Sequence, residues 1–367
     1  MTQKNNFEMV VINMPKKKII SFPLIGNYSV PITRLLRTLF PDHEIRPAPA
    51  MTRRTLELGC RHSPEMVCSP FKYTLGNYIE ALEQGAEILL QTGMGCLFGY
   101  YGEVQEKILR ELGYKFSFIC FSRDAARPGA IYRTLREHGS PLNPLQMVTA
   151  LRTAVAGIRA MDCVENYMRE NIAFVGNDAG VMEKLHTRLL TELADAADVR
   201  AVNALGRRYN TAIRNITTGH PDKPVKIGIV GELYTIMEPF SNFHLEQTLG
   251  ESGAAISRKM NASFLLFDRS NRKSLRGAGD YLTYTAGANG VDSVAQTVDY
   301  ARQGYDGVIH VKAFGCTPEL NVVPAMQKVG RDYNMPILNL SFDSHTSETG
   351  VETRLEAFMD MIYMRRK

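Results

Sequence analysis

The sequence predicts an α/β protein in which two parallel-sheet domains flank a mainly helical one. Residues 18–123 alternate short apolar runs with amphipathic stretches, and the same alternation resumes at Val225. This is the pattern of strands joined by helices in a mostly parallel sheet. Between Pro141 and Thr218, apolar residues instead recur at intervals of three and four, which is the period of helices. The chain has 367 residues, enough for two or three compact units.

The N-terminal domain is expected to span residues 1–140. Its predicted strands are "KIISFP", "EILLQT" and "FSFICF", and its predicted helices are "GNYIEALEQG" and "YGEVQEKILRELGY". Residues 141–222 form the predicted helical domain, which the Pro-containing turn "TTGHPDKPVK" ends. Residues 223–367 form a second α/β domain that reads "VKIGIVGEL", "HLEQTLGESG", "ASFLLF", "DGVIHVKAFG" and "MPILNLSFD", followed by the final helix "GVETRLEAFMDMIYMRR". Both outer domains are therefore predicted to be Rossmann-like.

Composition excludes several classes of protein. The 43 basic and 38 acidic residues are dispersed, so the net charge of +5 does not indicate a nucleic-acid surface. No apolar run is long enough to span a membrane, and the segment "IISFPLIGNYSVPI" lacks the continuous apolar centre of a signal peptide. We therefore expect a cytoplasmic protein. Its six cysteines contain no CxxC pair, which argues against a zinc ribbon or a thioredoxin-like site.

Three of the cysteines share one predicted geometry. Cys96 follows a strand and a glycine-rich turn, Cys316 does the same in the second α/β domain, and Cys68 precedes the helix "FKYTLGNYIEALEQG". Each lies at a helix N-terminus, where backbone N–H groups and the helix dipole are expected to lower the pKa of a thiol. Cys96 and Cys316 also lie at carboxyl ends of strands, where open α/β sheets bind ligands.

Three such thiolates can hold an iron–sulfur cluster in a cleft between the two outer domains. Backbone N–H groups in the turns at Gly95 and Gly315 can hydrogen-bond its sulfides, and Lys72 can steady its negative charge. Three cysteines leave one iron of a [4Fe-4S] cluster open. Buried cysteines are also common as packing residues, so these residues by themselves leave the choice between a metal site and a packing role open.

The other candidates are less regular. Cys60 is close enough to Cys68 in sequence to be a fourth ligand, whereas Cys120 and Cys163 are interpreted as structural. Two further sets of side chains also lie at predicted sheet edges. Glu232 and Tyr234 are candidates to line the cleft, and the loop "SFDSHTSETG" offers Asp343, His345 and Glu348 either as an acid–base or metal cluster or as a cap of the final helix.

Four separated blocks resemble a known family. They are "CSPFKYTLGNYIEALEQGAEILLQTGMGCLFGYYGEVQEKILRELGY", "GELYTIMEPFSN", "GYDGVIHVKAFGCTPE" and "LNLSFDSHTSETGVETRLEAFMDM". In this order they are similar to the proteins related to 2-hydroxyacyl-CoA dehydratases and their activases, also called CoA-protein activase-related proteins. The resemblance implies a cysteine-ligated iron–sulfur cluster between Rossmann-like lobes. The cysteines of the family fall on Cys68, Cys96 and Cys316.

The resemblance also implies function and partners. Relatives pass single electrons to an acyl-CoA thioester and eliminate water, as lyases, or carry a double-cubane cluster and carry out ATP-driven low-potential reductions in anaerobic metabolism. The chain has no glycine-rich phosphate loop of the actin-like ATPase, so a separate activase is implied. Related systems work as dimers, so a homodimer is expected. Leu97 stands where the family pattern has a basic residue, which affects the expected contacts with partner or substrate. The alternative is a non-catalytic module that binds an acyl-CoA or a partner without a functional cluster.

Overall fold

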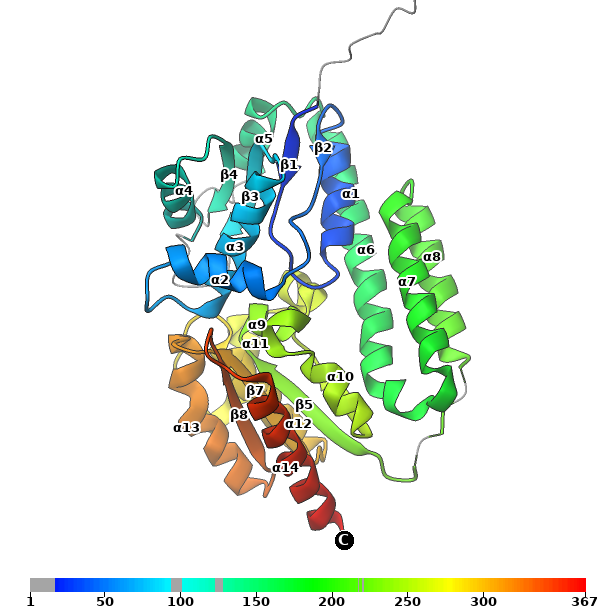
Figure 1. Ribbon diagram of the computed structural model, residues 1–367. Helices are drawn as coiled ribbons and strands as arrows, with labels where there is room; N and C mark the ends of the chain where they lie inside the picture. Colours follow the sequence, from blue (N-terminus) through cyan, green and yellow to red (C-terminus); the bar gives the residue numbers. More distant parts are fainter. Residues whose placement is uncertain (1–16, 94–100, 123–127, 217, 220) are drawn as a thin grey trace, which may run out of the picture.

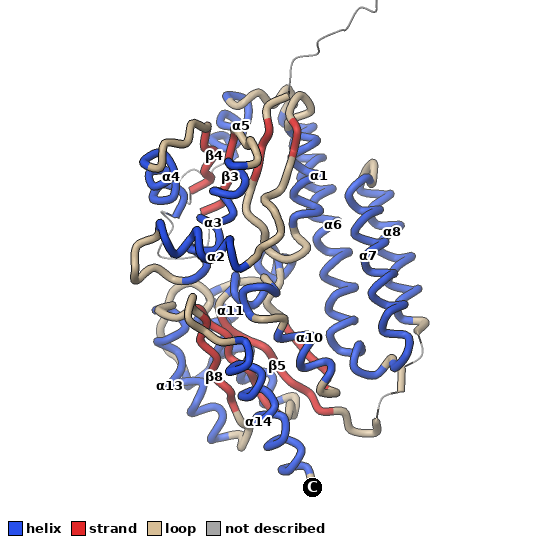
Figure 2. Tube along the Cα trace, in the orientation of Figure 1, coloured by secondary structure: helices blue, strands red, loops and turns tan. Residues whose placement is uncertain are grey.

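The computed structural model describes residues 17–93, 101–122, 128–216, 218–219 and 221–367. Within them the predicted α/β class is confirmed, because the strands form two separate four-stranded sheets in which every pairing is parallel. Figure 1 shows one sheet above the other, with the long helices of residues 144–214 along one side. Figure 2 shows that helices enclose both sheets.

The first sheet has the strand order β2-β1-β3-β4. Its strands are β1 (Ile19–Ser21), β2 (Glu44–Ile45), β3 (Ile88–Gly93) and β4 (Ser117–Ser122). Its helices are α1 (Ser29–Leu39), α2 (Arg53–His62), α3 (Ser69–Glu83), α4 (Tyr101–Glu111) and α5 (Pro128–Glu137). Ile20 and Leu89 are fully buried in apolar clusters on opposite faces of the sheet. Helices therefore cover both faces, which accounts for the nearly continuous apolar runs in these strands.

The helical segment consists of α6 (Pro144–Asn171), α7 (Ala179–Asp195) and α8 (Val199–Arg214). Asn143 begins α6 with a reciprocal cap, since its side chain accepts the Gln146 N–H and the Gln146 side chain accepts the Asn143 N–H. Asp198 caps α8 in the simpler way, through the Ala201 N–H. The long helix α6 packs against α8 and α1, and also against β6 of the second sheet, so it contacts both α/β units.

The second sheet has the order β6-β5-β7-β8. This is the same topology as in the first sheet, with β5, β6, β7 and β8 in the places of β1, β2, β3 and β4. Its strands are β5 (Val225–Gly231), β6 (Ala254–Arg258), β7 (Gly307–Ala313) and β8 (Ile337–Phe342). Its helices are α9 (Leu233–Met237), α10 (Leu245–Glu251), α11 (Asn271–Ala278), α12 (Gly290–Arg302), α13 (Thr317–Asp332) and α14 (Glu348–Arg366). Helices α10 and α14 pack on one face, and α12 and α13 pack on the other.

One predicted strand is wrong. The run "ASFLLF" was expected to continue the strand pattern, but residues Phe264–Asp268 form a short π-helix, and the edge strand β6 lies earlier, at Ala254–Arg258. In β6, buried and half-buried residues alternate, as expected for an edge strand that is covered on one side. Leu266 and Phe267 in this run are exposed, whereas Phe264 and Leu265 are half-buried and pack against the core of the second sheet.

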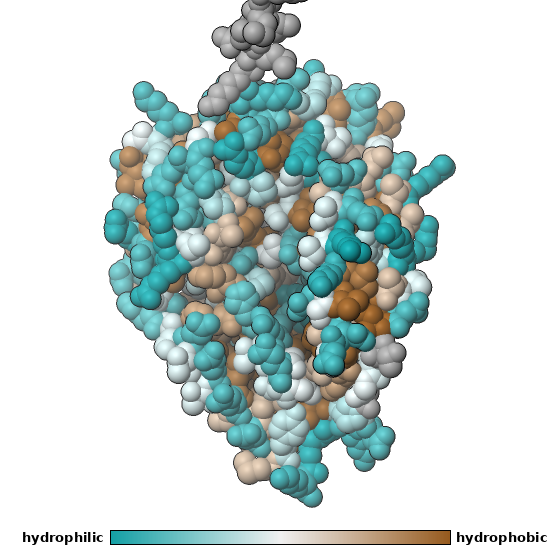
Figure 3. Space-filling model, turned by 45° about the vertical axis from the view of Figure 1, so that its right-hand side comes forward, coloured by the Kyte–Doolittle hydropathy of each residue, from teal (hydrophilic) through white to brown (hydrophobic). Residues whose placement is uncertain are grey.

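The surface in Figure 3 is mostly hydrophilic, with apolar residues gathered in small groups. The most exposed large apolar side chains in the described part of the chain are Met66 and Leu145. None of the described helices combines the length and apolar character that a membrane span requires.

Candidate functional site

The two sheets each have a topological switch point. In the second sheet, β5 lies between β6 and β7. The chain passes from β5 to β6 on one side and then crosses to β7 on the other side, so the switch point lies at the carboxyl ends of β5 and β7. Ligands of open α/β sheets bind at such a point. Glu232 directly follows β5, and Cys316 follows β7 by three residues. Both predicted residues therefore lie at the edge where a ligand is expected.

The structure confirms the predicted positions of Cys68 and Cys316 at helix starts. Cys68 is the N-cap residue of α3 and Cys316 is the N-cap residue of α13, and each is followed by a proline in the first turn. Gly315 precedes Cys316 with φ of +76°, a conformation that glycine adopts without strain. Cys96 and Gly95 lie outside the described residues, although the sequence puts Cys96 three residues after β3, the counterpart of β7.

Cys68 begins a helix of the first α/β unit and Cys316 begins a helix of the second, but the two residues lie close together. The hydroxyl of Ser69 donates to the carbonyl of Phe342, the last residue of β8, at 3.2 Å, which joins the start of α3 to the carboxyl edge of the second sheet. A thiolate at Cys68 is near enough to raise the pKa of Cys316. The Cys68 sulfur is also hydrogen-bonded to the Tyr101 hydroxyl. The tertiary structure therefore brings together two thiols that are 248 residues apart in sequence.

The pKa of Cys316 differs from the prediction. Burial raises the pKa of this thiol, and the nearby Glu232 carboxylate raises it further. The backbone N–H of Glu319, in the first turn of α13, acts in the opposite direction but is outweighed. The predicted lowering of the Cys316 pKa by the helix N-terminus was therefore wrong when no cation is bound. Desolvation of the charged sulfur raises the pKa by more than the helix N-terminus lowers it.

We tested whether the donors at this edge fit an iron–sulfur cluster. Among the residues that the structure describes, no group of three His, Cys, Asp or Glu side chains is arranged to hold a metal ion. Cys68 and Cys316 supply two sulfur donors at one place, and the third predicted ligand, Cys96, lies outside the described ranges. Cysteine thiolates are the donors that an iron–sulfur cluster takes, so these two described residues fit such a group as part of its ligand set.

The other predicted ligands and contact residues do not gather there. Cys60 lies near the end of α2, close to Tyr73. Lys72 donates to the carbonyl of Glu65 at 3.4 Å, a bond within its own segment.

The two cysteines interpreted as structural differ in exposure. Cys120 lies in β4, where burial raises the pKa of its thiol to about 11. Cys163 lies in α6, and its side chain is exposed rather than packed into the core.

The acidic candidates have local roles. Glu232 caps α9, since its carboxylate accepts the N–H groups of Tyr234 and Thr235 at 2.8 and 2.9 Å, and burial raises its pKa. Tyr234 is buried, with its hydroxyl donating to Met51 Sδ at 3.4 Å.

The loop after β8 behaves as a helix cap. Asp343 accepts the His345 N–H and the Thr346 hydroxyl, both at 2.9 Å. Burial acts to raise the pKa of Asp343, but these donors outweigh it and the pKa is lowered. Ser347 caps α14, and Glu348 is the exposed first residue of that helix. Of the two interpretations of this loop, the capping one agrees with these contacts.

Sequence reasoning missed a polar stripe near Cys316 that is buried on β7 and half-buried on β8. It consists of His310 and Lys312 on β7 and their register partners on β8, Asn339 and Ser341. His310 Nδ1 lies 2.9 Å from Asn339 Oδ1, and His310 Nε2 lies 2.8 Å from Glu319 Oε2. The Lys312 ammonium donates to the Ser341 hydroxyl. The signal was present in the sequence, because polar residues with a period of two interrupt "VIHVKA" and "ILNLSF".

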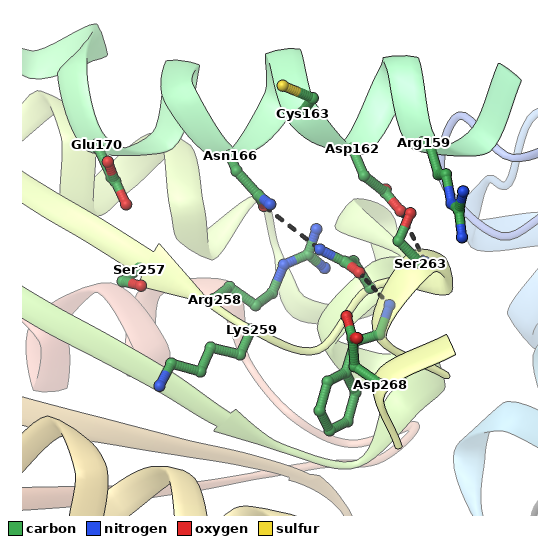
Figure 4. Close-up of a pocket in the computed structure, with 12 residues that line it drawn as sticks. Arg159, Asp162, Cys163, Asn166, Glu170, Ser257, Arg258, Lys259, Ser263 and Asp268 are labelled. Carbon is green, nitrogen blue, oxygen red and sulfur yellow. Dashed lines mark hydrogen bonds between the residues drawn. The ribbon is translucent and has the colours of Figure 1, made fainter. Parts of the chain in front are cut away.

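A separate cavity of about 570 Å³ lies between α6 and the carboxyl end of β6 (Figure 4). Three of its polar residues already have partners, two of them outside the cavity. Asp162 accepts the Ser263 N–H at 2.8 Å, Arg258 is ion-paired with Glu246 at 2.8 Å, and Lys259 is ion-paired with Asp299. We therefore interpret this cavity as part of the packing between α6 and the second sheet rather than as a ligand site.

Comparison with known proteins identifies one matching family. Residues 281–362 match the family described as 2-hydroxyglutaryl-CoA dehydratase, D-component. The matched segment contains α12, β7, α13 and β8 and most of α14, and with them Cys316 and the polar stripe. No curated protein matches the chain. Over this segment, which contains the blocks "GYDGVIHVKAFGCTPE" and "LNLSFDSHTSETGVETRLEAFMDM", the chain is similar to that dehydratase component, as these two blocks predicted.

Proposed function

We propose that this chain is an iron–sulfur component of a 2-hydroxyacyl-CoA dehydratase-type system in the cytoplasm. In this proposal Cys68, Cys96 and Cys316 hold a cluster of the [4Fe-4S] type, with a double-cubane cluster as the variant known in related systems. The observation that carries the proposal is the proximity of Cys68 and Cys316 across two sheets, each at the start of a helix. The match of residues 281–362 to a dehydratase component supports it.

Such a cluster supplies one-electron chemistry at low potential. The residues of this chain would bind and orient it, and the buried surroundings of Cys316 would exclude water from one side. A ligand cation replaces the proton of a thiol, so the raised pKa of Cys316 makes binding compete with protonation. The protein would then act either as a dehydratase, a lyase of 2-hydroxyacyl-CoA, or as an electron-transferring part of an ATP-dependent reductase.

The proposed partners follow from the same assignment. The low-potential electron would come from a separate actin-like ATPase activase, and the substrate would be an acyl-CoA thioester. We also expect a homodimer, which light scattering coupled to gel filtration would measure. These partners would work in anaerobic metabolism, because an iron that is open at one coordination position reacts readily with oxygen.

A second candidate function is a binding or regulatory module without a functional cluster. The buried, protonated state favoured for the Cys316 thiol between Glu232 and Glu319 supports it, because a neutral thiol needs no metal. In this candidate the cleft would bind an acyl-CoA or a protein partner.

Anaerobic purification with reconstitution, followed by iron and sulfide quantification, distinguishes the two candidates. We expect a brown protein that bleaches on reduction and gives an electron paramagnetic resonance signal. Cys316→Ala should lose most of its iron, whereas Cys163→Ala, which removes an exposed thiol, should keep it. A colourless wild-type protein without iron or sulfide would exclude the cluster and leave the binding module.

A further inference from the structure

A lysine side chain is buried in the second sheet. Lys312 lies on β7 and is only 5% exposed to solvent. Its ammonium donates to the hydroxyl of Ser341 on the adjacent strand, its partner in the sheet register. Among the residues that the structure describes, Lys312 forms no ion pair with a carboxylate. A lysine is rarely buried to this extent without a negatively charged partner.

The negative groups whose charge acts on Lys312 are Cys316 and Glu319, and one oxygen of Glu319 is bound to other residues. Glu319 Oε2 accepts the Ser293 hydroxyl at 2.9 Å and lies 2.8 Å from His310 Nε2. Its other oxygen, Oε1, is buried and has no hydrogen-bond partner among the described atoms. Glu319 and a thiolate at Cys316 both lie close enough to favour the charged form of Lys312, although burial outweighs them and lowers its pKa. The local structure thus holds a buried cation beside Cys316.

An ammonium has three N–H donors, and the described contacts of Lys312 use one of them. Burial of an ammonium costs several kcal/mol unless a charge of opposite sign compensates for it. A fixed hydroxyl cannot provide that charge. An anionic group bound at the carboxyl edge of β7 would supply it, in addition to the nearby Glu319 carboxylate.

We propose that Lys312, held in place by Ser341, supplies the positive charge that retains an anionic iron–sulfur cluster bound at Cys316 and raises its reduction potential. This inference rests on the proposed function and names a positioning residue for that site. Taking up one electron makes a cluster more negative by one charge. A fixed cation nearby therefore stabilises the reduced form more than the oxidised form. Lys312 acts on the cluster through space and is not one of its ligands.

The test compares four variants with the wild-type protein after anaerobic reconstitution. Lys312→Met removes the charge, Lys312→Arg keeps it, and Ser341→Ala leaves the lysine but removes its fixed partner. Lys328→Met is the matched control, because Lys328 is an exposed lysine of α13 paired with Asp332 at 2.6 Å. The measurements are iron and sulfide content, and a redox titration followed by electron paramagnetic resonance.

In Lys312→Met we expect the ratio of reduced to oxidised cluster at a fixed potential to fall about tenfold. For one electron this is a lowering of the midpoint potential by about 59 mV. Ser341→Ala should shift it in the same direction by less, and Lys312→Arg and Lys328→Met should stay near the wild-type value. A folded Lys312→Met that loses iron, together with a Lys312→Arg that keeps it, would show that the positive charge retains the cluster and would also support the proposal.

An unchanged midpoint potential in Lys312→Met with wild-type iron content would overturn this inference and leave the proposed function standing. If Lys312→Met does not fold, Ser341→Ala decides, and an unchanged midpoint in that variant would overturn it. A wild-type protein that binds no iron overturns the proposed function, and the inference fails with it. The failures of the two proposals are therefore distinguishable.

Discussion

The hydroxyl of Tyr28 donates to Asp162 Oδ1 at 2.6 Å, and this bond joins the loop after β1 to the middle of α6. The same hydroxyl accepts the Ala262 N–H at 3.1 Å, and the second oxygen of Asp162 accepts the Ser263 N–H at 2.8 Å. Both Tyr28 and Asp162 are buried. The first α/β unit, the helical segment and the second α/β unit thus meet at one hydrogen-bonded pair.

Tyr28→Phe should lower the free energy of unfolding by about 1–3 kcal/mol, because it leaves a buried carboxylate and a backbone N–H without their partner. Urea unfolding followed by circular dichroism measures the loss. Tyr363→Phe is the matched control, since Tyr363 donates to the Ser252 carbonyl at 2.8 Å on the exposed surface. Equal losses in the two variants would show that the buried junction has no special importance.

Glu165 makes stability depend on acid pH. Burial by itself would raise the pKa of Glu165, but the His186 hydrogen bond and the Arg169 charge outweigh it, and its pKa falls to about 2 from an ordinary value of 4.5. Because the folded pKa is lower than the unfolded one, this stability is present above pH 4.5 and is lost as pH falls toward 2. The shift corresponds to about 3 kcal/mol.

Glu165→Gln should therefore be less stable at pH 7 by about 3 kcal/mol or more, since the buried Arg169 loses a partner. The variant should also lose less stability than the wild-type protein between pH 5 and pH 2. Glu57→Gln serves as the control, because Glu57 forms an exposed ion pair with Arg53. Parallel pH profiles for wild-type protein and Glu165→Gln would contradict the assignment.

Gly231 is the last residue of β5 and admits no side chain. Its φ is +138°, and a Cβ atom there would lie 1.8 Å from the carbonyl oxygen of Val311. Gly231→Ala should destabilise the protein by about 3 kcal/mol or more, because neither backbone can yield without breaking the pairing of β5 with β7. Thermal unfolding would measure this.

Gly315→Ala separates backbone strain from crowding. Gly315 also has a positive φ, +76°, but a Cβ atom there meets nothing within 4 Å. We expect a smaller cost of about 1–2 kcal/mol, which is that of the left-handed conformation for a residue with a side chain. A larger loss in Gly315→Ala than in Gly231→Ala would contradict this account.

Cys163 should be labelled by N-ethylmaleimide before Cys120 and Cys316 when the protein carries no metal. Cys163 is exposed, whereas burial raises the pKa of the other two thiols and reduces their thiolate fraction. Peptide mapping by mass spectrometry after short exposure at pH 7.5 gives the order. Labelling of Cys316 ahead of Cys163 would show that the cleft is more open than the structure indicates.

Local pattern was enough to predict several elements. The apolar runs of β3, β4, β5, β7 and β8 and the periodicity of α6, α7 and α8 were read directly from the sequence. It did not reveal α1, α2 or the two-residue strand β2. The strand β2 has only two residues, too few to show alternation, whereas α1 and α2 are amphipathic and their signal was present in the sequence. The error at "ASFLLF" arose because an apolar run alone does not distinguish a strand from a turn of helix.

The sequence by itself determined that Cys68 and Cys316 begin helices, because the strand before Cys316 and the prolines after both cysteines are local signals. Only the tertiary structure decided that the two thiols lie together, that Lys312 is buried near Cys316, and that His310 is buried against Glu319. It also reversed the expected direction of the Cys316 pKa shift. The physical reason is that desolvation and through-space charge depend on neighbours distant in sequence, whereas a helix start depends on residues next to it.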